Sequence, residues 1–152
     1  YKLRNDPRVV NMEKCNIRYI DRGLIEPLDF ISVDVSFISL ALIFPVAADM
    51  LKDSGKMVCL IKPQFEAGRE QVGKKGIVRD RKVHVQVIEN VIKYTIKNGL
   101  RPAGLTYSPV TGAKGNIEFL LYIDGKLKQD EIFDDEILGI RKVVNTSHEE
   151  LE

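Results

Sequence analysis

The chain has 152 residues, of which 44% are hydrophobic and 30% are charged, as is ordinary for a soluble globular domain with a sizeable core. The formal net charge of +1 gives no support for nucleic-acid binding, so any affinity for RNA has to come from a local basic patch. No apolar run approaches the roughly 18 residues that span a bilayer, which argues against stable membrane insertion.

The sequence contains two cysteines, Cys15 and Cys59, and neither falls in a metal-ligand spacing. No segment has the pattern of a signal peptide, so we expect reduced thiols and a cytoplasmic location. The chain begins at Tyr1 without an initiator methionine and runs directly into a strand-like segment, which indicates a fragment or a missing beginning.

The N-terminal part of the chain predicts two strands. The Asp6-Pro7 turn signal precedes a short strand at residues 8–12, and residues 16–21 are expected to form a loop or a helical turn. Residues 29–35 (DFISVDV) are apolar enough for a second strand that is buried on both faces.

The next elements are a helix and a third strand. Residues 39–51 predict the helix, which Pro45 either kinks or delays. A turn is expected at residues 53–56 and a buried strand at residues 56–61 (KMVCLI). Residues 63–80 form a long loop rich in glycine and charge, and loops of this length are uncommon unless they are functional or disordered.

The remaining elements complete an alternating pattern. Apolar residues at helical spacing predict a helix over residues 81–98, which Gly99 ends. The elements expected after it are a strand at 100–108, a turn at 109–116, a final strand at 117–123 and a polar tail with a short helix around 131–144. This order predicts a doubly wound α/β sheet, in which chemistry is located at the carboxyl ends of the strands.

Three charged residues occupy such positions: Asp34 ends a strand, Lys62 follows KMVCLI, and Glu118 lies at the start of the last strand. Charges at these places are costly unless they are paired, which favours a functional interpretation. Each residue also has a purely structural interpretation: Asp34 as a helix cap, Lys62 as a surface lysine and Glu118 as an outward-facing strand residue.

Four blocks of sequence carry a resemblance to a known family. They are KLRNDPRVVNMEKCNIRYI, DVSFISL, IKPQFEAGREQVGKKGIVRD and SPVTGAKGNIEFLLYI, which together cover roughly residues 2–123. In this order they resemble the TlyA/haemolysin A family of FtsJ-like RNA 2′-O-methyltransferases. The resemblance implies a Rossmann-like methyltransferase fold and methyl transfer from S-adenosylmethionine to ribose hydroxyls of ribosomal RNA, with that RNA or a ribosomal subunit as the partner.

The resemblance also implies site residues. FtsJ-like enzymes carry a Lys-Asp-Lys-Glu set, in which Asp34 matches the aspartate, Lys62 the second lysine and Glu118 the glutamate. The first lysine belongs upstream of this chain. In this interpretation Glu118 orients Lys62. Lys62 either holds the ribose hydroxyl or accepts its proton, or it stays charged and stabilises the developing oxyanion.

Cofactor and RNA contacts follow from the same resemblance. The turn that meets the adenine corresponds to Asn16 and Ile17, with Asp34 and Val35 beside the methyl donor. Core packing is an equally good interpretation of Ile17. In the long loop, Arg69, Lys74, Lys75 and Arg79 form a basic patch for phosphates, although a solvated, mobile loop explains these charges equally well.

The glycine-rich cofactor loop of the family is not found in this sequence, and the first two strands of its sheet, which has the order 3-2-1-4-5-7-6, are expected to precede Tyr1. Residues 1–123 are then a partial methyltransferase domain and residues 124–152 a tail. We expect the strand that ends at Asp34 to form an exposed edge, residues 8–12 to be displaced from it, and the chain by itself to have little cofactor affinity. An inactive RNA-binding module and a membrane-active haemolysin are the competing interpretations.

Overall fold

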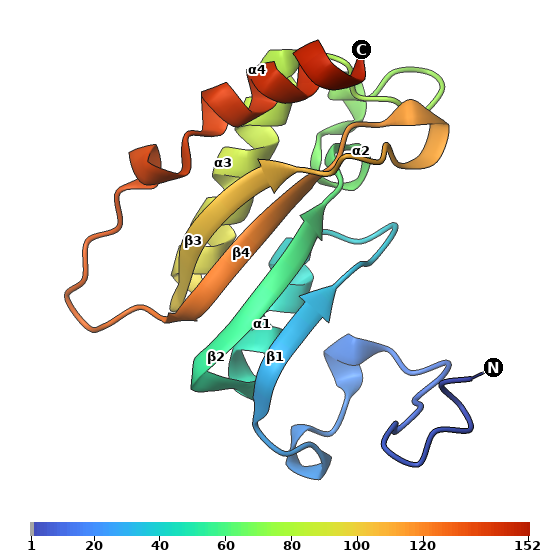
Figure 1. Ribbon diagram of the computed structural model, residues 1–152, viewed down its shortest axis with the longest axis vertical. Helices are drawn as coiled ribbons and strands as arrows, with labels where there is room; N and C mark the ends of the chain where they lie inside the picture. The colour runs from blue at the N-terminus through green and yellow to red at the C-terminus, as the bar shows by residue number, and fades with distance from the viewer. Residues whose placement is uncertain (1) are drawn as a thin grey trace.

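The computed structural model describes residues 2–152, which form one mixed sheet with helices packed against it (Figure 1). The four strands are β1 (Leu28–Val33), β2 (Leu51–Ile61), β3 (Leu100–Tyr107) and β4 (Phe119–Lys126). Their spatial order is β1-β2-β4-β3, with β1 and β2 parallel and β4 antiparallel to both of its neighbours. This order corresponds to the 4-5-7-6 half of the methyltransferase sheet.

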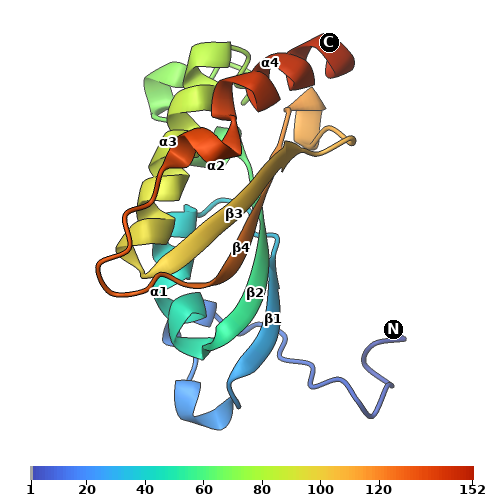
Figure 2. The ribbon, with the colours of Figure 1, turned by 60° about the vertical axis from the view of Figure 1, so that its left-hand side comes forward.

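The main helices are α1 (Leu40–Met50), α3 (Arg81–Lys97) and α4 (Ile140–Leu151), and α2 (Pro63–Glu66) is a single turn after β2. Short 3-10 turns connect them: η1 (Ile17–Tyr19), η2 (Arg22–Leu24), η3 (Arg69–Gln71), η4 (Ala113–Gly115) and η5 (Asp135–Leu138). Figures 1 and 2 show α1 and α3 over one face of the sheet, with α4 lying across α3.

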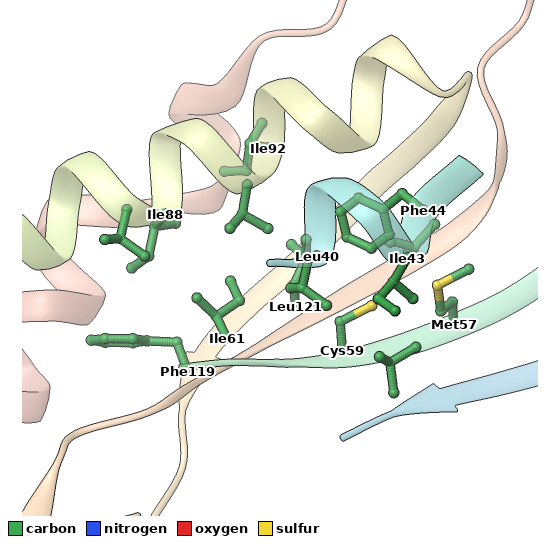
Figure 3. Packing of buried hydrophobic residues seen from close by; sticks show 14 of the residues in the cluster. Leu40, Ile43, Phe44, Met57, Cys59, Ile61, Ile88, Ile92, Phe119 and Leu121 are labelled. Atoms are coloured by element: carbon green, nitrogen blue, oxygen red, sulfur yellow. The ribbon is translucent and has the colours of Figure 1, made fainter. Parts of the chain in front are cut away.

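The core lies between this sheet face and the helices (Figure 3). Alternate residues of β2 and β4 point into it, as the period of two along a strand requires. Phe44 of α1, Met57 of β2, Ile88 of α3 and Phe119 of β4 are among its largest fully buried side chains. Cys59 is buried among them, and burial raises the pKa of its thiol to about 12, so the thiol is protonated and inert.

Helix boundaries follow local capping chemistry. The Ser39 hydroxyl accepts a hydrogen bond from the Ala41 N–H at 3.1 Å, and Asp80 Oδ1 accepts one from the Lys82 N–H at 2.8 Å, so α1 and α3 both begin at side-chain caps. Gly99, with φ of +72°, ends α3 as predicted. Pro45 stands inside α1 without delaying its start.

The structure corrects several sequence predictions. Residues 8–12 are not a strand: Arg8 and Val9 both turn back to Asp6, and the segment has no partner strand. The expected turn at 53–56 lies within β2, where the pairing with β1 jumps from Leu51 to Lys56. The strand expected to be buried on both faces has one buried residue, Val33 of β1, while its place at the edge of the sheet agrees with the expected exposed edge.

The C-terminal residues also differ from the expected polar tail. The helix expected around residues 131–144 begins later, as α4 at Ile140, after the η5 turn. Leu138, Ile140 and Val144 are buried in the core, so this segment is packed on the sheet and α3. Across residues 2–152, no helix has the length and apolar character needed to cross a membrane.

Candidate functional site

Asp34 and Lys62 meet at the carboxyl edge of the sheet. They directly follow β1 and β2, whose parallel pairing aligns Val33 with Cys59. Lys62 Nζ lies 2.6 Å from Asp34 Oδ1 and donates a hydrogen bond to Ser36 Oγ at 3.1 Å. The Lys62 side chain is 13% exposed and that of Asp34 is 72% exposed, so a recessed ammonium is held by a carboxylate that is open to solvent.

Glu118 is buried nearby but has a different partner. Gln64 Nε2, in α2, donates a hydrogen bond to Glu118 Oε2 at 2.9 Å, and Glu118 itself is only 6% exposed. Among residues 2–152 no ion pair joins Lys62 to Glu118. The expected Lys62–Glu118 pair is therefore corrected to a Lys62–Asp34 pair and a Gln64–Glu118 pair.

Gln64 has a second distinguishing feature. Within the described part of the chain, its Oε1 is the one buried side-chain nitrogen or oxygen that lacks a hydrogen-bond partner. Its Nε2 must face the Glu118 carboxylate, because the opposite amide orientation would place Gln64 Oε1 against Glu118 Oε2, and both oxygens can only accept hydrogen bonds. Buried polar atoms are usually satisfied, so this acceptor distinguishes Gln64 from the other buried polar residues.

The segment from Lys62 to Glu66 ties the site to its surroundings. Glu66 accepts hydrogen bonds from Ser39 Oγ at 2.7 Å and from the Leu40 N–H at 2.8 Å, at the start of α1. Burial raises the pKa of Glu66, and these two hydrogen bonds oppose that rise. The four side chains of Lys62, Gln64, Phe65 and Glu66 thus each contact a different partner around the site.

Phe37 is a residue that the sequence analysis missed. The residue is 88% exposed and its φ is +64°. Its ring lies 4.8 Å from the Phe65 ring, measured between centroids, at an angle of 50°. A left-handed backbone is unfavourable for a bulky residue and is found preferentially at functional sites. The signal in the sequence was an aromatic residue three positions after Asp34, in a segment too short to bury it.

Gly112 is packed directly against the Glu118 carboxylate, where a Cβ atom would lie 2.2 Å from Oε2. We expect Gly112→Ala to displace this carboxylate from Gln64 and to lower the activity of the site by at least about 10-fold, because small misplacements at a site are costly. Stability should change by less than about 1 kcal/mol, since the obstacle is the end of a flexible side chain. Activity and thermal unfolding are measured against Gly104→Ala, whose Cβ would make an ordinary 3.6 Å contact with Tyr122.

Asn16 and Ile17 lie beside α1, away from the regular strands. The Asn16 side chain accepts a hydrogen bond from the Arg18 N–H at 3.0 Å and so caps η1, while Ile17 is partly buried against the core. Val35 is also packed partly against the core. The structure therefore gives each of these three residues a local structural contact, and their role toward a cofactor stays a prediction.

The basic loop is ordered by Asn116, a second residue that the sequence analysis did not single out. Asn116 is 1% exposed, and its side chain accepts from the Val78 N–H at 2.9 Å and donates to the Gly76 carbonyl at 2.9 Å. Lys74, Lys75 and Arg79 line a hollow of about 340 Å³ in this loop, and Arg69 lies outside that lining, in η3. Asn116 thus connects the loop to the segment that carries Glu118.

The strand order and the charged pair at the carboxyl edge are those expected for an α/β protein of the methyltransferase type. The sequence model of the FtsJ-like methyltransferase family matches residues 1–124, and the chain belongs to that family. The resemblance read from the four sequence blocks is thereby confirmed, as is the Rossmann-like α/β fold class.

Three curated relatives match most of the chain. The Bacillus subtilis protein YqxC, provisionally named an rRNA methyltransferase, is 46% identical over 160 residues, covering 99% of this chain and 54% of the relative. Hemolysin A of Brachyspira hyodysenteriae is 44% identical and covers 80% of this chain and 52% of its own length. The Mycobacterium tuberculosis 16S/23S rRNA (cytidine-2′-O)-methyltransferase TlyA is 36% identical, covering 81% of this chain and 46% of the relative. The chain thus spans about half the length of these relatives.

Two solved structures agree with the fold. A protein from Streptococcus thermophilus, provisionally named a hemolysin, superposes with a TM-score of 0.90 at 44% identity, covering 98% of this chain and 54% of the other. A protein from Lactococcus lactis with a similar provisional name superposes with a TM-score of 0.85 at 44% identity, covering 97% of this chain and 70% of the other.

Proposed function

We propose that the full-length protein transfers a methyl group from S-adenosylmethionine to a ribose 2′-hydroxyl of ribosomal RNA, in the cytoplasm, with Asp34, Lys62 and Glu118 at the reacting centre. The observation that carries this proposal is the recessed Lys62 ammonium, held by Asp34 and Ser36 where two parallel strands end. Membership of the methyltransferase family and the printed name of the TlyA relative support it.

The reaction forms a bond between the ribose 2′-oxygen and the methyl carbon, breaks the bond between that carbon and sulfur, and releases the hydroxyl proton to solvent. S-adenosylmethionine, when bound, supplies an electrophilic methyl group. The Lys62 ammonium is placed to stabilise the negative charge that develops on the 2′-oxygen. Asp34 and Ser36 limit the rotamers of Lys62, so the charge is already oriented when the RNA arrives.

The described residues fit the reacting end of the methyl donor better than its nucleoside end. Asp34 offers an exposed carboxylate beside Lys62 at the end of β1. In residues 2–152, β1 and β2 are each followed directly by a charged residue rather than by a glycine-rich turn. We propose that Asn16 and Ile17 border the adenine and that Val35 lies beside the methyl donor, and we assign them no step in the reaction.

The proposal is tested on the full-length protein. S-adenosylmethionine is titrated by calorimetry, and transfer of a labelled methyl group is followed on ribosomal subunits that lack the modification. We expect cofactor binding, label in the RNA, and a methylated position whose phosphodiester bond resists alkaline cleavage, because a 2′-O-methyl group removes the internal nucleophile. Label on a base instead of the ribose, or the absence of transfer to either subunit, would contradict the proposal.

An inactive RNA-binding module is the second candidate, and one observation favours it: Glu118 faces Gln64 and not Lys62. It predicts binding to ribosomal RNA without methyl transfer, unchanged by Lys62→Ala. The two candidates therefore differ in the result of the same labelling experiment.

Phe37 supplies a prediction about the substrate. An exposed ring held beside Phe65, close along the chain to Asp34, is suited to stack on a base of the RNA. We expect Phe37→Ala to raise the KM for RNA by about 10-fold or more, since stacking on one base contributes about 1–3 kcal/mol. Steady-state kinetics compare it with Ile132→Ala, which removes another fully exposed side chain, and equal KM values for the two variants would refute the stacking role.

A further inference from the structure

A basic groove lies between α3 and α4. It is a hollow of about 510 Å³, and its polar lining includes Arg81, Lys82 and Gln86 from α3, and Arg141 and Asn145 from α4. Glu89 is the acidic residue that also borders it. Three cations therefore face one carboxylate in a concave surface whose remaining polar groups are two amides.

Tertiary packing brings these cations together across a long sequence separation. Arg81 Nη1 donates a hydrogen bond to Asn145 Oδ1 at 3.2 Å, and His84 Nδ1 lies 2.8 Å from His148 Nε2 in the buried contact between the helices. Figures 1 and 2 both show α4 lying across the N-terminal end of α3. The position of Arg141 is therefore set by a packed helix and not by a loose tail.

The groove cations occupy unfavourable places for helix stability. Arg81 and Lys82 lie in the first turn of α3, and Arg141 and Lys142 lie in the first turn of α4, with no acidic residue in either turn. The positive end of the helix dipole disfavours cations there and favours anions. Gly139, which precedes α4, provides no side-chain cap for the first N–H groups of that helix.

The groove is adjacent along the chain to the basic loop of Lys74, Lys75 and Arg79, at the edge of the sheet where the candidate site lies. A helix that follows a strand in this fold begins at the carboxyl edge, where Asp34 and Lys62 lie. Lys74, Lys75 and Arg79 line the neighbouring hollow immediately before Arg81 in the chain. Asp80, which lies between them, has one carboxylate oxygen engaged in capping α3.

We infer that this groove docks the phosphate backbone of the RNA substrate, so that the RNA path runs from the reacting centre over the basic loop to α3 and α4. The inference rests on the proposed function. Cations and amides match phosphate oxygens and ribose hydroxyls, whereas a protein partner is usually bound through aromatic and apolar anchors. Val85, the apolar side chain in the lining, is partly buried against the core and offers no such anchor.

The inference is tested with the double variant Lys82→Glu/Arg141→Glu in the full-length protein, against Lys128→Glu. Lys128 is exposed in the loop that follows β4, at the opposite edge of the sheet (Figure 1). Binding to ribosomal RNA is measured over a salt series, together with kcat and KM for methyl transfer and thermal unfolding. We expect a Kd at least about 10-fold higher for the double variant, a salt slope shallower by about 1–2, and kcat unchanged at saturating RNA.

Thermal unfolding separates a binding role from a structural one. Glutamate in the first turn of a helix is favourable, so the double variant should unfold at the same temperature as the wild type or higher. The neutral double variant Lys82→Gln/Arg141→Gln should also bind RNA more weakly than the wild type, with a smaller loss of affinity than the charge reversal causes. If charge reversal lowers the unfolding temperature, the RNA affinity of the neutral double variant decides whether the groove binds RNA.

The outcomes distinguish failure of the groove from failure of the proposed function. An unchanged Kd and salt slope in both double variants, with normal methyl transfer, would overturn the groove and leave the proposed function standing. RNA binding that depends on the groove without methyl transfer in the wild type would overturn the proposed function and retain the groove. Binding of an acidic protein, with no effect of the variants on RNA, would also overturn the inference.

Discussion

Replacing Lys62 by alanine in the full-length protein is expected to lower kcat for methyl transfer by about 10²–10³-fold, the range for loss of one group that stabilises charge developing in the transition state. The Lys62 ammonium is recessed at 13% exposure and bound to Asp34 at 2.6 Å, so it is aligned before the substrate binds. Because it acts on charge that develops during the reaction, its loss should lower kcat more than it raises KM. Single-turnover methyl transfer and RNA binding are the two measurements.

Lys62→Arg is the informative control for this variant. It keeps the positive charge, and it offers a planar fork in place of the compact ammonium that fits between Asp34 and Ser36. We expect activity between that of alanine and the wild type, with RNA affinity retained. A Lys62→Ala enzyme with wild-type kcat would remove Lys62 from the reacting centre and favour the inactive binding module.

The second large effect concerns pH and the buried His84. His84 Nε2 lies 2.9 Å from the Val78 carbonyl, which can only accept, so this nitrogen carries the proton. Its Nδ1 therefore accepts from His148 Nε2 at 2.8 Å, and His148 Nδ1 lies 2.8 Å from Glu152 Oε1. A second proton on His84 would set two donors against each other inside the core. Burial, with a smaller contribution from His148, lowers the pKa of His84 to about 4, although its hydrogen bond to Val78 and the charges of Asp80 and Glu152 oppose this.

The sign of the pH effect follows from this direction. A pKa of about 4 in the folded protein lies below the usual 6.5, so the unfolded chain binds the proton more readily. Stability is therefore fully present above pH 6.5 and is lost as the pH falls toward 4. Between pH 7.5 and pH 5 the expected loss in the free energy of unfolding is about 2 kcal/mol.

Urea unfolding at a series of pH values measures this loss. The side chain of His84→Gln cannot be protonated, so the stability of this variant should lack the decline between pH 6.5 and 5. At pH 7.5 the variant should be less stable than the wild type, because it loses the buried hydrogen bonds of the imidazole. Carboxyl groups with lowered pKa values, such as those of Asp6 and Glu131, lose their contribution at more acidic pH and do not obscure this window. An equal decline in the wild type and His84→Gln would show that another group is responsible.

Some of the fold could be predicted because local sequence is sufficient for it. The period of apolar residues in α3, the Asp80 cap and Gly99 determine that helix at both ends. The apolar runs of β2 and β4 identify these strands in the same way. The strand prediction for residues 8–12 was wrong, because a strand requires a partner for its backbone groups and this segment has none. Likewise, the helix α4 was placed too early, because its start depends on Ile140 and Val144 finding the core.

Family and candidate chemistry were accessible from the sequence itself, because ordered motif blocks place Asp34, Lys62 and Glu118 at the ends of strands. The partners of these charges were decided by tertiary structure. Which charge meets which depends on strand register and on the turn of α2, which directs Lys62 to Asp34 and Gln64 to Glu118. Asn116 is hydrogen-bonded to Val78 in the basic loop, and Asn145 of α4 is hydrogen-bonded to Arg81 of α3. Tens of residues separate the partners in each pair, and no local pattern encodes such contacts. They arise only when helices and loops pack on the sheet, because packing is where distant side chains come within bonding distance.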